Sequence, residues 1–318
     1  MNVKIIKELG YGMIGTVYKV KYNNKYYAMK IEHILHEDKE NKNSSIWKEN
    51  DFMEKIASKY KNQFVKMYKY EFIDKCEHVQ KYSTDLKKMD EKNKNKLFKL
   101  AESKICIQRF YELLDGSAKS LISTLDQNQI YSFIVQVAYI VNILEKHEYL
   151  HGDLHLENIG YIKTTKKFIY CDKIKVPTHG YIFKAIDFGT IMHKKDFVNN
   201  YLFTKELKKP LLASLINFDK FWEYVDNNNI KIDYRHFKNF KNWNISKGIN
   251  DIFSEIKDEH KVSILRILYP EQSQKLMLGN KYTKTFSPIL YVDIWDIIFI
   301  YKCNFNSQKI FDYFLEKL

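Results

Sequence analysis

The sequence predicts an α+β protein whose first third is rich in strands and whose remainder is rich in helices. Apolar residues alternate over residues 3–31, as they do in strands with one buried face. From Ile130 to Leu144 they recur instead at spacings of three and four, which is typical of an amphipathic helix. The change of period near residue 113 indicates two domains, residues 1–112 and 113–318.

The first domain begins with strands that are separated by turn residues. Glycines interrupt the alternation after Leu9, and Asn23-Asn24 marks a hairpin turn. The elements expected next are a helix over residues 44–58, a strand over 64–73, a polar, Lys-rich surface insertion over 74–103 and a strand that resumes at Ile105.

One long helix is expected early in the second domain. Asp126 is suited to cap its N-terminus, and the helix ends near His147, shortly before His151-Gly152-Asp153. Most of the sequence after Asp187 is expected to be helical, with apolar centres at 221–225 and 294–301.

Composition limits the classes of protein to consider. With 318 residues, 45% of them hydrophobic, the chain can bury a large core. No run of about 18 uncharged apolar residues is present, so we expect no membrane span. The first residues lack the apolar run of a signal peptide, and Cys76, Cys106, Cys171 and Cys303 form no CxxC motif. We expect reduced thiols, no structural zinc and a cytoplasmic location.

The formal net charge of +13 suggests a comparison with nucleic-acid-binding proteins. Nearly all of the positive charge is lysine, because arginine occurs only at Arg109, Arg235 and Arg266. Since base recognition relies on the bidentate guanidinium group, a solvated lysine surface is the better interpretation, and we do not expect nucleic-acid binding. A basic surface still favours acidic partners, including acidic protein substrates.

A glycine-rich segment joins the first two expected strands. Gly10, Gly12 and Gly15, followed by Val17, fit the pattern G-x-G-x-x-G-x-V. Glycines let backbone N–H groups approach phosphate oxygens where a Cβ would collide. A strand follows these glycines, whereas dinucleotide-binding folds place a helix there, so the segment favours a flap over phosphates rather than an NAD site.

The segment Ala28-Met29-Lys30 lies on the next expected strand. A lysine at an inward-facing strand position is costly unless an anion meets it. Nucleotide phosphates are such an anion, and a glutamate on the following helix can hold the lysine in place. We expect Glu49 to be that partner, with Glu54 as the alternative.

Two further segments supply oxygen ligands and a base. Asp153 and Asn158 have the D-x-x-x-x-N spacing that lets a carboxylate take a hydroxyl proton while an amide oxygen holds Mg²⁺. Asp187, in Asp-Phe-Gly after an apolar strand, adds a second carboxylate. Together with phosphates, these oxygens form the ligand set that Mg²⁺ prefers. The four segments, in this order, predict a phosphotransferase that uses ATP and Mg²⁺.

These motifs resemble those of the protein kinase superfamily, over residues 4 to about 225. The resemblance implies a bilobal fold, with a small β-rich N-lobe that has one main helix and a larger, mainly helical C-lobe with a helical C-terminal extension. It also implies an active Ser/Thr protein kinase that moves the γ-phosphoryl group of ATP to a protein hydroxyl.

The resemblance assigns roles to single residues. It places the adenine against the backbone of residues 108–113. The nucleotide-binding residues that it implies are Gly10, Gly12, Gly15, Val17, Ala28 and Lys30, the catalytic residues are Asp153, Lys30, Glu49 and His155, and the metal ligands are Asn158 and Asp187.

The sequence departs from the kinase pattern at several positions. Gly152 stands where most members have an Arg that grips a phosphorylated activation loop, so we expect activity without such phosphorylation. His155 replaces the usual Lys and is similar to small-molecule and atypical kinases. The long gap between Asn158 and Asp187 predicts an enlarged hairpin. The HGDLHxxN form and residues 175–189 resemble kinases of large DNA viruses, of the poxvirus and giant-virus kind, which would act in the host cytoplasm or the virion.

Two other functions and one structural assignment stay open. One alternative is a small-molecule kinase of the aminoglycoside or choline type, because such kinases share the H-x-D-x-x-x-x-N pattern. A kinase-fold module that binds without catalysis is the other alternative, although the intact set of polar residues argues against it. The aspartate that kinases bury below the catalytic loop is either Asp219, which we favour, or Asp293.

Overall fold

The computed structural model describes residues 3–12, 15–78, 98–100, 102–193 and 306–318. The chain divides into two compact units, Met1–Asp115 and Gly116–Leu318. An antiparallel sheet dominates the first unit and a 20-residue helix the second, which confirms the α+β class. The predictions that lie outside the described residues concern 79–97, the helical centres at 221–225 and 294–301, Asp219 and Asp293.

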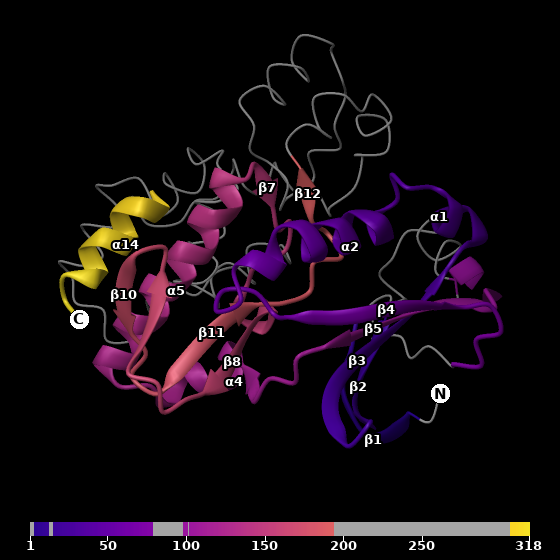
Figure 1. Cartoon of the computed structure of the whole chain (residues 1–318), viewed down its shortest axis with the longest axis horizontal. Helices are drawn as coiled ribbons and strands as arrows, with labels where there is room; N and C mark the ends of the chain where they lie inside the picture. Colours follow the sequence, from indigo (N-terminus) through magenta and orange to yellow (C-terminus); the bar gives the residue numbers. More distant parts are fainter. Residues whose placement is uncertain (1–2, 13–14, 79–97, 101, 194–305) are drawn as a thin grey trace, which may run out of the picture. The chain divides into compact units, whose positions relative to one another are not determined.

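The first unit is built on a five-stranded antiparallel sheet with the order β1-β2-β3-β5-β4 (Figure 1). The hairpin between β2 and β3 turns at Asn23 and Asn24, which both have positive φ, so the predicted turn is confirmed. The strands are β1 (Lys4–Tyr11), β2 (Gly15–Tyr22), β3 (Lys25–Ile34), β4 (Met67–Ile73) and β5 (Ile105–Tyr111).

Helix α2 (Ser45–Lys55) covers part of this sheet. Its Trp47 ring contacts Tyr70 and Phe72 of β4. A separate apolar cluster packs on β2, β3 and β5, with Val20, Met29, Ile31, Cys76, Cys106 and Phe110 at its centre. The remaining helical turns of the unit are α1 (His36–Glu40) and the 3₁₀ turn η1 (Ala57–Lys59).

Helix α5 (Gln127–Lys146) is the core element of the second unit. Asp126 caps it as predicted, because its side chain accepts from Gln129 N while the Gln129 side chain accepts from Asp126 N. The C-terminal helix α14 (Ser307–Leu315) packs along α5 through the ring pairs Tyr131–Phe314 and Tyr139–Phe311.

Short sheets complete the second unit, in the orders β11-β8-β6, β10-β9 and β12-β7. Their strands are β6 (Gly116–Ser117), β7 (Tyr149–Leu150), β8 (Ile159–Lys163), β9 (Phe168–Cys171), β10 (Ile174–Pro177), β11 (Tyr181–Ala185) and β12 (Met192–His193). The short helical turns are α4 (Ala118–Leu121), η3 (Ile122–Thr124) and η4 (Leu156–Asn158).

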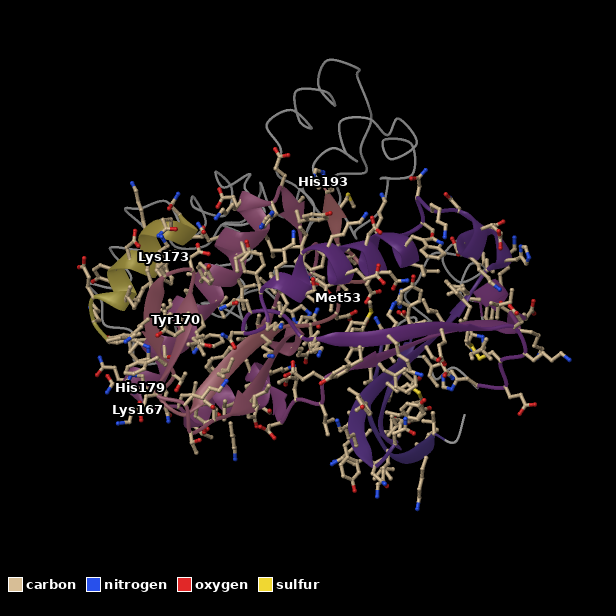
Figure 2. All side chains as sticks on the ribbon, viewed as in Figure 1. Met53, Lys167, Tyr170, Lys173, His179 and His193 are labelled. Carbon is tan, nitrogen blue, oxygen red and sulfur yellow. A yellow bond between two sulfur atoms is a disulfide. The ribbon has the colours of Figure 1, made fainter. Side chains whose placement is uncertain are left out.

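The β9–β10 hairpin explains the long gap between Asn158 and Asp187. It is inserted between β8 and β11, which pair with each other, so the predicted enlarged hairpin is present. One of its faces is buried through Ile169, Cys171 and Val176. Figure 2 shows Tyr170 and Lys173 on this hairpin, where both are exposed. The insertion therefore adds a small amphipathic ribbon to the second unit.

The expectation of reduced cysteines is wrong for two of the four, because Cys76 and Cys106 form a disulfide. Cys106 lies on β5 and Cys76 follows the neighbouring strand β4, so residues 30 apart in sequence meet across the sheet. Their separation in sequence gave no sign of this contact. Cys171 is buried and lies outside this disulfide. Among the described residues, no helix is long and apolar enough to cross a membrane.

Candidate active site

In the first unit, Lys30 lies at the middle of β3 beside a second charged residue. Its Nζ lies 2.9 Å from Glu32 Oε1, and both side chains are largely buried. The two residues are two positions apart on one strand and therefore point to the same face of the sheet. Lys30 faces Val17 across β2 and Arg109 across β5. Lys30 and Arg109 thus stand opposite each other on two neighbouring strands.

Arg109 is the centre of this charged group, and its side chain is 0% exposed. Its guanidinium binds Glu32 and lies 3.2 Å from Glu49 Oε2, while its Nε donates to Asn50 Oδ1 at 2.8 Å. A further N–H donates to the Ile46 carbonyl at the start of α2. We call Lys30, Glu32, Glu49, Asn50 and Arg109 the Arg109 network. It connects the predicted nucleotide lysine with the predicted glutamate through shared partners.

Electrostatics in the Arg109 network favours a charged guanidinium. Burial alone lowers the pKa of Arg109, but the carboxylates of Glu49 and Glu32 outweigh it and raise that pKa above its ordinary value. Burial and the Glu49 carboxylate raise the pKa of Tyr111 well above its usual range, so this phenol stays neutral. Its hydroxyl donates to Glu49 Oε1 at 2.9 Å. Each buried charge is therefore matched by a partner.

The glycine-rich segment joins β1 to β2, where Gly12 N donates to Gly15 O at 2.8 Å. A Cβ at Gly15 would lie 2.7 Å from Glu32 Cγ and 3.3 Å from Lys30 Cε. Only a residue without a side chain therefore fits beside the ion pair. A Cβ added at Gly10 or Gly12 would meet no close contact. Val17 on β2 and Ala28 on β3 are half-buried.

In the second unit, two segments far apart in sequence are joined around His151. His151 Nε2–H donates to the carbonyl of Ile186 at 2.9 Å, and Thr190 Oγ1 donates to the His151 carbonyl at 2.7 Å. Ile186 N donates to the Asn158 carbonyl at 2.9 Å. These bonds fix residues 151–158, which we call the Asp153 loop, against the segment that carries Asp187.

The Asp153 loop is closed by its own polar side chains. Asn158 Nδ2 donates to the Asp153 carbonyl at 2.8 Å and lies 3.4 Å from Asp153 Oδ2. Glu157 N donates to His155 Nδ1, and His155 Nε2 lies 3.1 Å from Asn158 Nδ2 and 3.5 Å from Asp153 Oδ2. The Asp153 side chain is 42% exposed. The carboxylate is thus oriented by neighbours but open to a ligand.

Asp187 follows β11 at a sharp change of backbone direction, with φ 59°. The next residue, Phe188, is buried with its ring centre 4.9 Å from that of His151, while Asp187 is exposed. Burial lowers the pKa of His151 to about 4, although Asp153 and Asp187 act in the opposite direction. The buried ring is therefore neutral at pH 7, and the hydrogen bonds around it hold the backbone of Asn158 beside that of Ile186, which directly precedes Asp187.

Gly152 has a structural reason to lack a side chain. Its φ is +80°, and a Cβ there would lie 2.6 Å from the Thr190 carbonyl oxygen. An arginine at this position would require the Thr190 backbone to move. The departure from the kinase pattern at Gly152 therefore accompanies a close approach of two backbone segments.

Sequence reasoning missed the Arg109 network beyond Lys30 and Glu49. A signal was present, because Arg109 is one of three arginines among 52 basic residues and stands in a mostly apolar strand. Glu32 was detectable too, since it shares a face of β3 with Lys30. Burial of these charges could not be inferred without knowing which strands are neighbours.

Comparisons with known proteins give likenesses among solved structures alone. No protein-family model and no curated protein matches the chain. Among solved structures, the chain is similar to the kinase domain of PF14_0431, with 21% sequence identity and a TM-score of 0.37. The match covers 60% of this chain and 52% of that chain, so this chain spans about half of that protein's length. Function is therefore inferred from the site residues themselves.

Proposed function

We propose that the protein is an ATP-dependent phosphotransferase, and specifically a Ser/Thr protein kinase with two lobes. The observation that carries this proposal is the geometry around His151. Hydrogen bonds tie the Asp153 loop to the segment before Asp187, and this connection supports a site to which Asp153, Asn158 and Asp187 all contribute. Phosphoryl transfer needs little more from a protein than such positioning and charge stabilisation.

Asp153 is the proposed general base. Its carboxylate takes the proton of the acceptor hydroxyl as that oxygen bonds to the γ-phosphorus, while the bond from the γ-phosphorus to the bridging oxygen breaks and ADP leaves. The partial exposure of the side chain allows an acceptor to approach. The hydrogen bond from Asn158 Nδ2 to the Asp153 carbonyl would keep the proposed base close to a proposed metal ligand.

Asn158 and Asp187 are the proposed Mg²⁺ ligands. The donor set fits, because Mg²⁺ prefers carboxylate and amide oxygens combined with phosphates. Since Asn158 Nδ2 is turned toward Asp153, its Oδ1 is the atom that would bind the metal. The bound ion would neutralise phosphate charge.

The first unit would supply the phosphate-binding lysine. The proposal requires both units to bind the same nucleotide, with Lys30 on its α/β-phosphates, Glu49 as the partner of Lys30, and the adenine against residues 108–113. Gly10, Gly12 and Gly15, with Val17 and Ala28, would cover the nucleotide. Glu32 is an additional anion on Lys30 that the phosphates would have to compete with.

His155 would act at the acceptor side. Its Nε2 lies 3.5 Å from Asp153 Oδ2, beside the proposed base, and the ring would contact the transferred phosphoryl group. The basic surface favours acidic peptides as acceptors.

The test is a phosphorylation screen with Mg²⁺ and labelled ATP. A peptide library is compared with aminoglycosides and choline, for the full chain and for Asp153→Asn. We expect Ser/Thr peptides to be labelled and the variant to lose about 10²–10⁴-fold in rate. The control is Asp312→Asn, an exposed aspartate of α14. Equal rates in Asp153→Asn and wild type would remove Asp153 as the base, and labelling of small molecules alone would exclude a protein kinase.

A binding measurement tests whether the two units share one nucleotide. Calorimetric titration with Mg²⁺ and ATP should show weaker binding in both Lys30→Ala and Asp187→Asn, because the lysine and the metal act on the same phosphates. If only one of these variants changes the affinity, the two residues do not act on a common ligand.

A further inference from the structure

Three metal-binding side chains gather at one end of the first unit's sheet. The ligand atoms of His33, Cys76 and Cys106 all lie within 4.8 Å of one another, and all three residues are buried. His33 on β3 stands directly opposite Cys106 on β5. Cys76 reaches them because Cys76 N donates to the Lys104 carbonyl at 2.7 Å, which anchors the segment after β4. We call these residues the His33 cluster.

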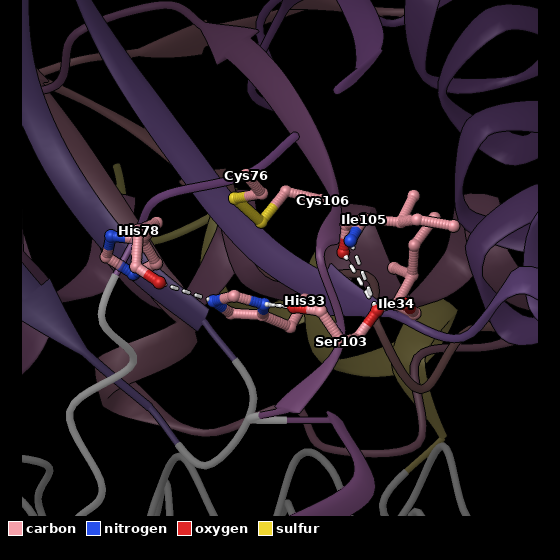
Figure 3. The surroundings of a disulfide bond; sticks show 7 residues. All are labelled: His33, Ile34, Cys76, His78, Ser103, Ile105 and Cys106. Carbon is pink, nitrogen blue, oxygen red and sulfur yellow. Dashed lines mark hydrogen bonds between the residues drawn. A yellow bond between two sulfur atoms is a disulfide. The ribbon is translucent and has the colours of Figure 1, made fainter. Parts of the chain in front are cut away.

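The His33 ring is held by backbone oxygens on both sides (Figure 3). Nδ1 lies 2.9 Å from the Ser103 carbonyl and Nε2 lies 2.7 Å from the His78 carbonyl. The Ser103 side chain is itself fixed, since it donates to the Ile34 carbonyl and accepts from Ile105 N. Of the two contacts, the one through Nδ1 is therefore the better anchored.

We propose that, when the Cys76–Cys106 disulfide is reduced, the His33 cluster binds Zn²⁺ through both sulfurs and His33 Nε2. Thiolates and imidazole are the ligands that zinc selects. Ligating histidines keep their orientation by donating the other ring N–H to a carbonyl, and the Ser103 carbonyl provides this bond. Nε2 exchanges the His78 carbonyl for the metal. The site lies outside the proposed active site and does not depend on it.

The step from disulfide to metal site has a defined balance. A dithiol reductant gives two electrons and two protons to the disulfide, becomes a cyclic disulfide itself and leaves Cys76 and Cys106 as thiols. Each thiol loses its proton when its sulfur binds Zn²⁺, so metal binding releases protons. The sulfurs can be joined to each other or bound to the metal, and either state crosslinks β5 to the segment after β4.

The His33 cluster lies on the same two strands as the Arg109 network. His33 directly follows Glu32 on β3, and Cys106 lies three residues before Arg109 on β5. The two strands pair in register from Ala28 to Ile34. A crosslink at the His33 end therefore supports the strand pair on which Lys30 and Arg109 lie, whether it is a disulfide or a metal ion.

The test uses Co²⁺ as a spectroscopic substitute for Zn²⁺ on the full chain. Reduced wild-type protein should develop a thiolate-to-cobalt charge-transfer band and intense tetrahedral d–d bands at one Co²⁺ per chain, and Zn²⁺ should displace it. The oxidised wild type is a control without any substitution, because its sulfurs are bonded, and it should show no band. Absence of the band in the reduced chain overturns the proposal, whether or not that chain stays folded, since a structural site would refold with its metal.

Variants then identify the ligands. Cys76→Ser and Cys106→Ser should each lose the two-thiolate band, and His33→Gln should bind Co²⁺ more than about 100-fold more weakly. The matched control is the double variant Cys171→Ser/Cys303→Ser, which leaves only the cluster's two cysteines and should keep the band. Loss of the band in this control, or its survival in Cys76→Ser, would assign the metal to other residues.

Discussion

The Arg109 network and the Asp153 loop handle charge in opposite ways. The network buries two carboxylates, a lysine and a guanidinium, and each is matched by an opposite charge. The one titratable side chain that the Asp153 loop buries is the neutral ring of His151, and its carboxylates lie partly or fully in solvent. A buried charge needs an opposite charge within the protein, whereas an exposed carboxylate is solvated and remains available to bind a ligand. The first arrangement holds a fold together and the second is suited to chemistry.

Of the variants that test this difference between the two regions, Arg109→Met should lose the most unfolding free energy. The variant keeps the volume but leaves the Glu32 and Glu49 carboxylates buried with less positive charge, which should cost about 3–5 kcal/mol of unfolding free energy. Urea unfolding followed by circular dichroism measures the loss.

A double variant separates charge from packing at the same position. Arg109→Met combined with Glu49→Gln removes one charge of each sign and should recover part of the loss. A cost below about 1 kcal/mol for Arg109→Met alone would mean that the buried charges do not depend on one another.

His151 should make the second unit sensitive to acid. The pKa of its ring is lowered by burial from 6.5 to about 4 in the folded chain, so between these values the unfolded chain binds a proton that the folded chain does not. Stability is therefore fully present above pH 6.5 and falls by about 3 kcal/mol as the pH decreases to 4. Unfolding free energies of wild type and His151→Gln, measured from pH 7 to 4, should converge by about this amount. Parallel curves would contradict a buried, neutral His151.

Alanine variants of two glycines with positive φ distinguish the cost of backbone strain from the cost of a steric collision. Gly152→Ala should cost about 2–3 kcal/mol, because the methyl group meets both an unfavourable φ and the Thr190 carbonyl. Gly180→Ala is the matched control, since its φ is +91° but no atom lies within 4 Å of the added Cβ, and it should cost about 1 kcal/mol. Equal losses of thermal stability in the two variants would show that the contact with Thr190 is easily relieved.

The smallest effect is expected at an ion pair on the surface of the Asp153 loop. Lys119 pairs with Glu157, and both side chains are more than half exposed. Lys119→Ala should change the unfolding free energy by less than about 1 kcal/mol, because solvent screens the pair. A loss as large as that of Arg109→Met would show that exposure does not distinguish the two regions.

Local patterns predicted most of what the structure describes. The alternation of apolar residues predicted the strands, and Asn23 and Asn24 predicted the hairpin turn. Asp126 predicted the capped N-terminus of helix α5. The spacing of Asp153 and Asn158 predicted that they act at one site, and the structure adds a hydrogen bond from Asn158 Nδ2 to the Asp153 carbonyl. These features depend on residues close in sequence, so the periodicity and turn chemistry of the chain determined them.

The features that the sequence did not reveal all join distant segments. The Cys76–Cys106 disulfide, the ion pairs of Arg109 and the packing of α14 on α5 each depend on which strands or helices become neighbours. The sequence by itself determined most of the secondary structure of the described residues and named the candidate base and the candidate metal ligands, because each is encoded within a few residues. Only the tertiary structure decided which charges are buried and which thiols meet, because burial and proximity are properties of the assembled sheet.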